Sequence, residues 1–182
     1  KQRLLLFCLA LLACVAGAHT GSTAYIDVTT AQDTVSATWR ISLRDLDLLV
    51  DLDADKNGTL TWDEVRAGTG AVQTLATRAL TVTAGNDPCA LSAHTPELSK
   101  NPEHDFVVVT LQGTCSGSTV QLTYSAFAGI DENHRALVRI NDSGEPQVLA
   151  PRASVVLVNE DALHSFGQFY REGIGHILSG ID

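Results

Sequence analysis

Strict alternation of apolar and polar residues is the most regular pattern in this chain. Between Val35 and Leu43 every second residue is apolar, and the residues between them are serine, threonine or arginine. A period of two places alternate side chains on opposite faces of a strand, so this stretch predicts a strand with one buried face. Residues 23–30 alternate in the same way and predict a preceding strand.

Four later stretches have the same strand-like composition, at residues 106–113, 118–127, 135–142 and 153–159. Clusters of glycine, serine, asparagine, aspartate and proline separate them, as turn residues do between short strands. Several short strands with regular turn signals predict a mainly β fold, an antiparallel β-sandwich. We expect one β-rich domain over residues 19–162, which is long enough to bury a substantial core.

A helical pattern interrupts the strands in the middle of the chain. Ser42 and Asp45 form a start that resembles a capping box, and apolar residues then recur at helical spacing. Thr61 and Glu64 form a second capping box, which opens another helix. The sequence therefore predicts an inserted helix–loop–helix.

Residues 53–64 of this insert read DADKNGTLTWDE and offer an oxygen wherever an EF-hand calcium loop uses one. Such a loop takes ligands from positions 1, 3, 5, 7, 9 and 12 and has glycine at position 6 for a sharp turn. Gly58 fills the glycine position. The expected ligands are Asp53, Asp55, Asn57, the backbone carbonyl of Thr59, Thr61 and Glu64. The alternative is a solvated turn rich in Asp and Asn that binds no ion.

Calcium is the expected ion, because it is a hard cation that takes six to eight oxygen ligands. EF-hands usually work in pairs, and this chain has a single loop of this kind. We therefore expect a structural site rather than a switch. Extracellular modules use weak sites, with Kd of about 0.1–1 mM, because calcium is abundant outside cells.

The start of the chain predicts export. It reads KQRLLLFCLALLACVAGAHT, with a positively charged beginning, an apolar run over residues 4–15 and small residues before a cleavage position. This order is typical of a secretory signal peptide, so we expect residues 1–18 to be removed after Ala18. A short buried helix and a lipoprotein signal with Cys14 as the lipidated residue are the alternatives.

Two cysteines, Cys89 and Cys115, lie outside the predicted signal peptide. An even number of cysteines in an oxidising compartment predicts a disulfide. By the chain-entropy estimate such a bond is worth roughly 3 kcal/mol. Two buried free thiols are the alternative.

Composition and missing motifs narrow the class of function. The formal net charge is −9, and loss of Lys1 and Arg3 with the signal peptide makes it more negative. An acidic surface argues against nucleic acid or anionic lipid as a partner. The sequence has no Ser/His/Asp order, paired-carboxylate motif, phosphate loop or cofactor fingerprint. We therefore expect a binding protein and not an enzyme.

The far end of the chain combines aromatic residues with an apolar segment. Phe166, Phe169 and Tyr170 precede a stretch that turns apolar at Ile174. Aromatic residues are enriched where helices enter a bilayer. We expect residues 163–182 to be the start of a transmembrane helix that continues beyond Asp182. A C-terminal amphipathic helix that packs on the sandwich is the alternative.

Four stretches carry a family resemblance: AHTGSTAYIDV (18–28), WRISLRDLDLLVDLDADKNGTLTWDEV (39–65), AFAGIDENHRALVRI (126–140) and FGQFYREGIGHILSGID (166–182). They are similar to the N-terminal exported part of the HupE/UreJ type of hydrogenase/urease accessory membrane protein. The resemblance touches much of the chain and implies a multi-helix membrane domain after this segment. Some members of that family are nickel permeases, so it also implies metal transport.

The nickel permeases of that family carry a histidine, five further residues and then an Asp-His pair on an early helix. In this sequence His176 is followed by five residues and then by Asp182, the last residue. The resemblance implies that His176 and Asp182 bind nickel or another transition metal. Glu172, four residues before His176, lies on nearly the same helix face. Histidine and carboxylates inside a membrane segment are costly and usually functional.

A further polar group, Asp131, His134 and Arg135, shares a turn that follows a predicted strand. Two interpretations remain for it. The residues form either a salt-bridged corner or a patch that contacts a partner.

The patterns and the resemblance together predict an exported calcium-binding domain of a membrane protein similar to HupE/UreJ-type metal permeases. Residues 19–165 would then lie on the periplasmic or extracellular side, anchored through the segment after residue 163, with a metal ion as partner. The alternative is a secreted, calcium-stabilised β-sandwich that binds a sugar or a protein.

Overall fold

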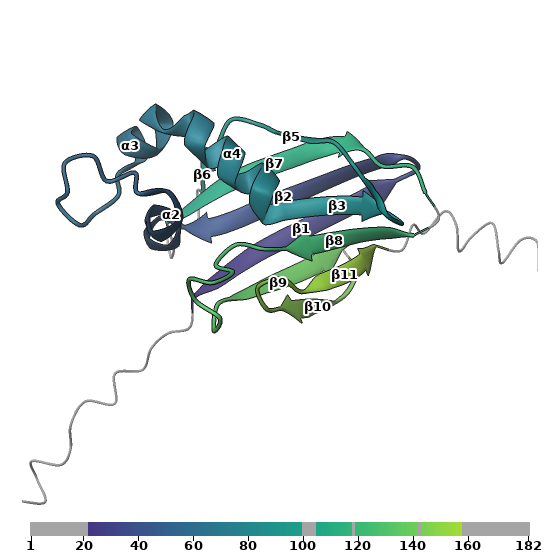
Figure 1. Ribbon diagram of the computed structural model, residues 1–182. Helices are drawn as coiled ribbons and strands as arrows, with labels where there is room; N and C mark the ends of the chain where they lie inside the picture. The colour runs from purple at the N-terminus through teal and green to yellow at the C-terminus, as the bar shows by residue number, and fades with distance from the viewer. Residues whose placement is uncertain (1–21, 100–104, 118, 142, 158–182) are drawn as a thin grey trace, which may run out of the picture.

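The computed structural model describes residues 22–99, 105–117, 119–141 and 143–157, which form a mainly β fold with two sheets (Figure 1). The larger sheet has seven strands, in the order β10 (Ser143–Leu149), β9 (Arg135–Ile140), β1 (Thr23–Ala31), β2 (Thr34–Ser42), β7 (Phe106–Thr114) and β5 (Leu91–Ala93), with β6 (Glu97–Leu98) also paired to β7. The smaller sheet has four, in the order β11 (Ser154–Leu157), β8 (Val120–Tyr124), β3 (Leu80–Ala84) and β4 (Asp87–Pro88). Three helices connect β2 to β3, namely α2 (Leu43–Val50), α3 (Trp62–Ala67) and α4 (Thr69–Ala79).

The alternation in the sequence decides which side chains form the core. In β2 the side chains of Val35, Ala37, Trp39 and Ile41 are buried, while the residues between them are only partly covered. Ile26 of β1 pairs with Trp39 and is buried as well. Buried residues of both sheets belong to a single hydrophobic core, so the prediction of a β-rich fold with one buried face per strand is confirmed.

One strand pairing departs from the predicted antiparallel β-sandwich. Strand β9 runs parallel to β1, with Val138 beside Ile26. Short hairpins join antiparallel neighbours, whereas a parallel pair needs a longer connection. Here β9 follows β8 of the other sheet and reaches β1 through residues 125–134. This crossover places β9 next to β1 with both strands running in the same direction. The larger sheet therefore contains both parallel and antiparallel pairs.

Several helix and strand boundaries in the structure also differ from the predicted ones. The predicted helix start at Ser42 and Asp45 is confirmed, because the hydroxyl of Ser42 accepts a hydrogen bond from the Asp45 N–H and caps the helix. Helix α2 therefore begins at Leu43, the residue with which the apolar alternation of the strand was expected to end. The strand predicted over residues 118–127 ends at Tyr124. Helix α4 and strands β3, β4, β5, β6 and β10 were not predicted.

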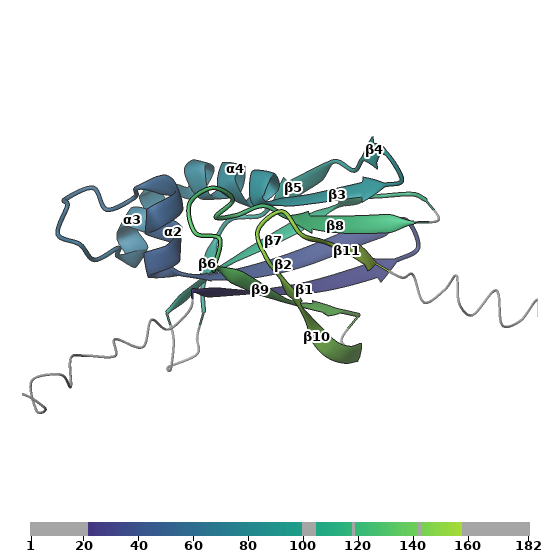
Figure 2. The ribbon, with the colours of Figure 1, turned by 60° about the horizontal axis from the view of Figure 1, so that its bottom comes forward.

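The loop between α2 and α3 and the last described residue, Leu157, lie at opposite ends of the strands. Strand β2 leads into α2 at Ser42, which pairs with Phe106 at the start of β7. Leu157 pairs with Val120, which in turn pairs with Ala84 at the end of β3. Figures 1 and 2 show α2 and α3 gathered at one end of the sheets, while β11 points to the other end.

Candidate metal centre

The start of the loop is fixed by the helix that precedes it. Helix α2 is followed by its C-cap residue Asp51, whose φ of 49° places it in the left-handed region. The Oδ1 atom of Asp47 then accepts hydrogen bonds from the N–H groups of Leu52 and Asp53, at 2.8 and 3.0 Å. Sequence reasoning missed Asp47. The usable signal was an acidic residue in the last turn of a helix, within reach of the backbone N–H groups that follow.

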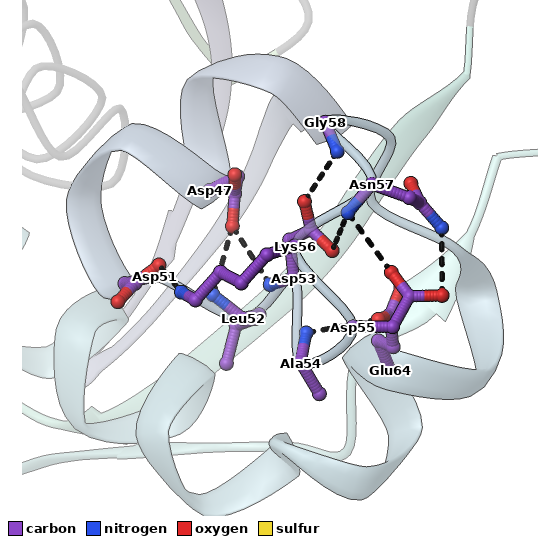
Figure 3. A network of polar contacts seen from close by, with 10 residues as sticks. All are labelled: Asp47, Asp51, Leu52, Asp53, Ala54, Asp55, Lys56, Asn57, Gly58 and Glu64. Atoms are coloured by element: carbon purple, nitrogen blue, oxygen red, sulfur yellow. Dashed lines mark hydrogen bonds and ion pairs between the residues drawn. The ribbon is translucent and has the colours of Figure 1, made fainter.

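The first half of the loop curls around Asp53, which is 5% exposed. Its Oδ2 accepts the Gly58 N–H at 2.7 Å and its Oδ1 accepts the Asn57 N–H at 3.2 Å (Figure 3). Asp55 accepts hydrogen bonds from the backbone N–H and the side-chain amide of Asn57. Gly58 has a φ of +81°, which a residue with a side chain rarely adopts, so glycine is required at this turn.

The second half of the loop is closed by Glu64, at the start of α3. Its Oε1 accepts the Ala54 N–H at 2.9 Å, and its Oε2 accepts the N–H and the hydroxyl of Thr61 at 2.9 and 2.7 Å. Thr61 in turn accepts the Glu64 N–H, which completes the predicted capping box. Thr59 donates its N–H to Asn57 Oδ1 at 2.8 Å. Glu64 therefore ties the two ends of the loop together.

Three of the six predicted ligands converge on one point. One carboxylate oxygen from each of Asp53, Asp55 and Glu64 lies within 4.8 Å of the other two. The side chains of Asn57 and Thr61 are turned to Asp55 and Glu64, with which they make the hydrogen bonds described above. The acidic residues thus form a cluster that a cation can bridge.

Hydrogen bonds within the loop hold the pKa of two carboxylates below their usual values. Burial alone would raise the pKa of Asp53, but hydrogen bonds from the Gly58 and Asn57 N–H groups help to lower it. For Glu64, the N–H and hydroxyl of Thr61 are the main cause of the lowered pKa. Both groups are therefore ionised at neutral pH and present negative charge to a cation.

Lys56, the basic residue within the loop, is paired outside the cluster. Its Nζ donates a hydrogen bond to Asp51 Oδ1 at 2.5 Å, and this pairing raises the pKa of the ammonium group. Figure 3 shows the lysine side chain extended toward Asp51 and away from Glu64. The negative charge of the converging carboxylates is thus left for another cation.

Apolar side chains anchor the insert to the β core. Leu60, inside the loop, is 6% exposed, and Val65 on α3 and Leu46 on α2 are fully buried. All three belong to the same hydrophobic core as the strands. The position of the loop is therefore set by packing on both sides as well as by its own hydrogen bonds.

The predicted cysteine pair is brought together. Cys89 and Cys115 lie at disulfide-bonding distance, with Cα atoms 5.1 Å apart and a sequence separation of 26. The bond links the segment before β5 to the end of β7.

The polar turn at residues 131–135 is organised around a buried histidine, and its ion pair joins Glu132 to Arg152 at 3.7 Å, not Asp131 to Arg135. His134 is fully buried. The Oγ of Ser22 lies 2.5 Å from its Nδ1 and the hydroxyl of Tyr124 lies 2.6 Å from its Nε2. Its ring also stacks on Phe127, with centroids 4.0 Å apart. Ser22 comes from a distant part of the sequence, so no local pattern could have revealed this environment.

Charged groups around this histidine shift its pKa in opposite directions. Burial lowers the pKa of His134, whereas the carboxylates of Asp45 and Asp131 oppose that shift and Arg135 adds to it. Asp45 is itself buried. Burial, reinforced by Asp45, also raises the pKa of Tyr124. The imidazole therefore remains neutral near pH 7.

The remaining predicted sites lie outside the described residues. These are the signal peptide at 1–18, the membrane segment at 163–182 and the possible transition-metal ligands His176, Asp182 and Glu172. Among residues 22–157, where described, no helix is both long and apolar enough to cross a membrane.

No known family model matches the chain, and no curated protein is significantly similar to it. The chemistry of the loop is therefore the basis on which a function can be argued.

Proposed function

We propose that this chain is the exported calcium-binding domain of a membrane protein similar to HupE/UreJ-type metal permeases. The observation that carries the calcium part is the convergence of Asp53, Asp55 and Glu64 within 4.8 Å. These residues occupy positions 1, 3 and 12 of the loop pattern, between α2 and α3. This arrangement supports an EF-hand-like helix–loop–helix inserted in a β-sandwich.

The donor atoms favour calcium over other cations. Every predicted ligand in the loop offers oxygen, and calcium accepts six to eight oxygen ligands in flexible geometry. Magnesium demands near-octahedral geometry and keeps several of its waters, so it binds such loops less well. Nickel prefers imidazole nitrogen among its ligands, and no histidine lies in residues 53–64.

The packing of the insert favours a stabilising role for the ion. In a calcium sensor, ion binding exposes apolar surface to a target. Here Leu46, Leu60 and Val65 are already buried in the core of the domain. A bound calcium ion would fix the positions of α2 and α3 relative to each other and so stabilise the folded domain. The proposed role is binding, with no catalytic step.

Calorimetric titration of the protein with calcium tests this proposal directly. We expect a binding heat with a Kd of about 0.1–1 mM, the range of extracellular modules, and a higher melting temperature in calcium than in chelator. Magnesium at the same concentration serves as the control and should give a smaller effect. The absence of both heat and a melting shift at millimolar calcium would exclude calcium binding.

The membrane part of the proposal rests on the family resemblance. It assigns transport of nickel or a similar metal to His176 and Asp182, helped by Glu172, in the segment that follows the described domain. The calcium loop lies at the end of the strands opposite to Leu157, from which the chain continues toward that segment. The donor sets also differ, with oxygen alone in the loop and a histidine with carboxylates in the later segment, which supports two independent sites, one for calcium and one for the transported metal.

Metal uptake by cells that express the full-length protein tests the second site. His176→Ala should reduce uptake and leave the calcium-dependent melting shift intact. Glu64→Gln should abolish the melting shift and change uptake only through the amount of protein. Normal uptake by a well-expressed His176→Ala protein would remove the transition-metal assignment.

A further inference from the structure

A hollow of about 660 Å³ lies on the outer face of the seven-stranded sheet, at the end of the strands far from the calcium loop. Strands β1, β2, β7 and β5 form its floor and walls. Thr29 alternates along β1 with the buried Val28, and Ser36 alternates along β2 with the buried Val35 and Ala37. Their side chains therefore project away from the core, into the hollow.

Four neutral polar side chains of the hollow have no partner within the part of the chain that the structure describes. The side chains of Thr29, Ser36, Gln112 and Thr114 line it and make no hydrogen bond to any other described residue. Each hydroxyl or amide can both donate and accept. Of the described residues that line the hollow, none is charged, although the chain has a net charge of −9.

Apolar groups alternate with these polar groups in the lining. Ala31, Ala90 and Leu91 supply C–H surface beside the hydroxyls and the amide. Small-molecule sites of about 300–1,000 Å³ combine apolar walls with a few placed polar groups, and this hollow falls within that range. The lining thus matches a ligand that is uncharged and carries both hydroxyl groups and C–H faces.

We propose that the hollow binds a short neutral oligosaccharide. A pyranose ring presents hydroxyls around its rim and C–H groups on its faces, which suits the mixture of neutral polar and apolar groups described above. A carboxylate or phosphate ligand would find no positive charge among the described lining residues. A purely apolar ligand would leave four hydrogen-bonding side chains without partners, which is unfavourable.

The hollow is built on rigid elements. Ser36 pairs with Gln112 across β2 and β7, which fixes two of the polar groups relative to each other. The Cys89–Cys115 disulfide holds the segment that leads into β5 against the end of β7. Gly113 allows Ala90 to approach, since a Cβ at this position would lie 2.1 Å from the Ala90 carbonyl oxygen. A preformed site loses less conformational entropy on binding than a flexible one.

The test is an NMR titration of the protein, in calcium buffer, with cellotriose, maltotriose and tri-N-acetylchitotriose. At least one of these sugars should shift the amide signals of Thr29, Ser36, Gln112 and Thr114 at millimolar concentrations. Ser36→Ala and Gln112→Ala should each weaken binding roughly fivefold, the effect of losing one hydrogen bond. Both positions are on the solvent face of the sheet, so both variants should fold.

A matched control comes from the other sheet. Gln121 lies on the outer face of β8, between the buried Val120 and Leu122. Gln121→Ala removes the same amide far from the hollow and should leave sugar binding unchanged. Glu64→Gln should also leave it unchanged, which separates this proposal from the one about calcium.

Three results would overturn the proposal. One is the absence of localised shifts with all three sugars in folded protein. Another is that the Gln112→Ala variant binds the sugar as tightly as the wild-type protein does. The third is equal or tighter binding of trigalacturonate or of an apolar peptide at the same residues, which would assign the hollow to an anionic or a protein ligand instead.

Discussion

Replacing Glu64 by glutamine is the sharpest test of how the insert works. The two carboxylate oxygens of Glu64 accept hydrogen bonds from Ala54 and Thr61. The amide of glutamine keeps one acceptor oxygen and the length of the side chain. It cannot, however, supply the two charged oxygens that the last position of a calcium loop provides. Glu64→Gln should therefore fold but lose calcium binding.

The size of the effect follows from linkage between binding and folding. At a calcium concentration about a hundredfold above Kd, binding to the folded state adds about 2.7 kcal/mol to the free energy of unfolding. For a domain of this size, 1 kcal/mol shifts the melting temperature by about 4 °C. The wild-type protein should melt about 10 °C higher in calcium than in chelator.

Differential scanning calorimetry in calcium and in chelator measures this shift. The Glu64→Gln protein should melt slightly below the wild type in chelator, because the ionised carboxylate accepts the Ala54 and Thr61 hydrogen bonds more strongly than an amide does, and it should gain almost nothing from calcium. Glu132→Gln is the matched control, because Glu132 also accepts a backbone hydrogen bond, from the Gly129 N–H at 3.0 Å, but lies outside the loop. It should keep the full calcium shift. A Glu64→Gln protein that still gains the full shift would refute the reasoning.

Three further predictions concern the rest of the domain. Reduction of the Cys89–Cys115 bond should cost roughly 3 kcal/mol of stability, seen as a lower melting temperature with reductant, and non-reducing mass spectrometry should recover the linked peptides. Because burial lowers the pKa of His134 in the folded state, the unfolded chain binds a proton on this imidazole more readily. The melting temperature should therefore fall as the pH drops below about 6.5, and the melting temperature of His134→Gln should lack this pH dependence. The lowered pKa values of Asp53 and Glu64 mean that their stabilising contribution is present above about pH 4 and is lost at lower pH. In melting experiments in chelator, acidification below about pH 4 should therefore lower the melting temperature of Asp53→Asn less than that of the wild type.

Local patterns allowed the sequence to predict part of this structure. The period of two between Val35 and Ile41 gave the buried face of β2, because side-chain direction alternates in any strand. The loop was predictable for a similar reason. The spacing of its oxygen-bearing side chains, its glycine and the capping box of Thr61 with Glu64 all act within about twelve residues.

Features that depend on distant residues could not be predicted in this way. The parallel pairing of β1 with β9 joins segments on the order of a hundred residues apart. The burial of His134 depends on Ser22, which is 112 residues away in sequence. Helix α4 has no side-chain cap at Gly68, and its threonine-rich sequence gives a weak helical signal. Its place is set by burial of Val72 and Ala76 against the core.

The placement of the loop at one end of the strands has an electrostatic consequence. Strand β2 alone has nine residues, so it spans about 30 Å at about 3.3 Å per residue. At physiological ionic strength the potential of an exposed charge decays over a Debye length of about 8 Å. The field of an ion held in the loop is therefore almost fully screened before it reaches Leu157. The ion therefore has little electrostatic effect through solvent on exposed groups near Leu157, and a larger effect on that end of the domain would have to pass through the paired strands.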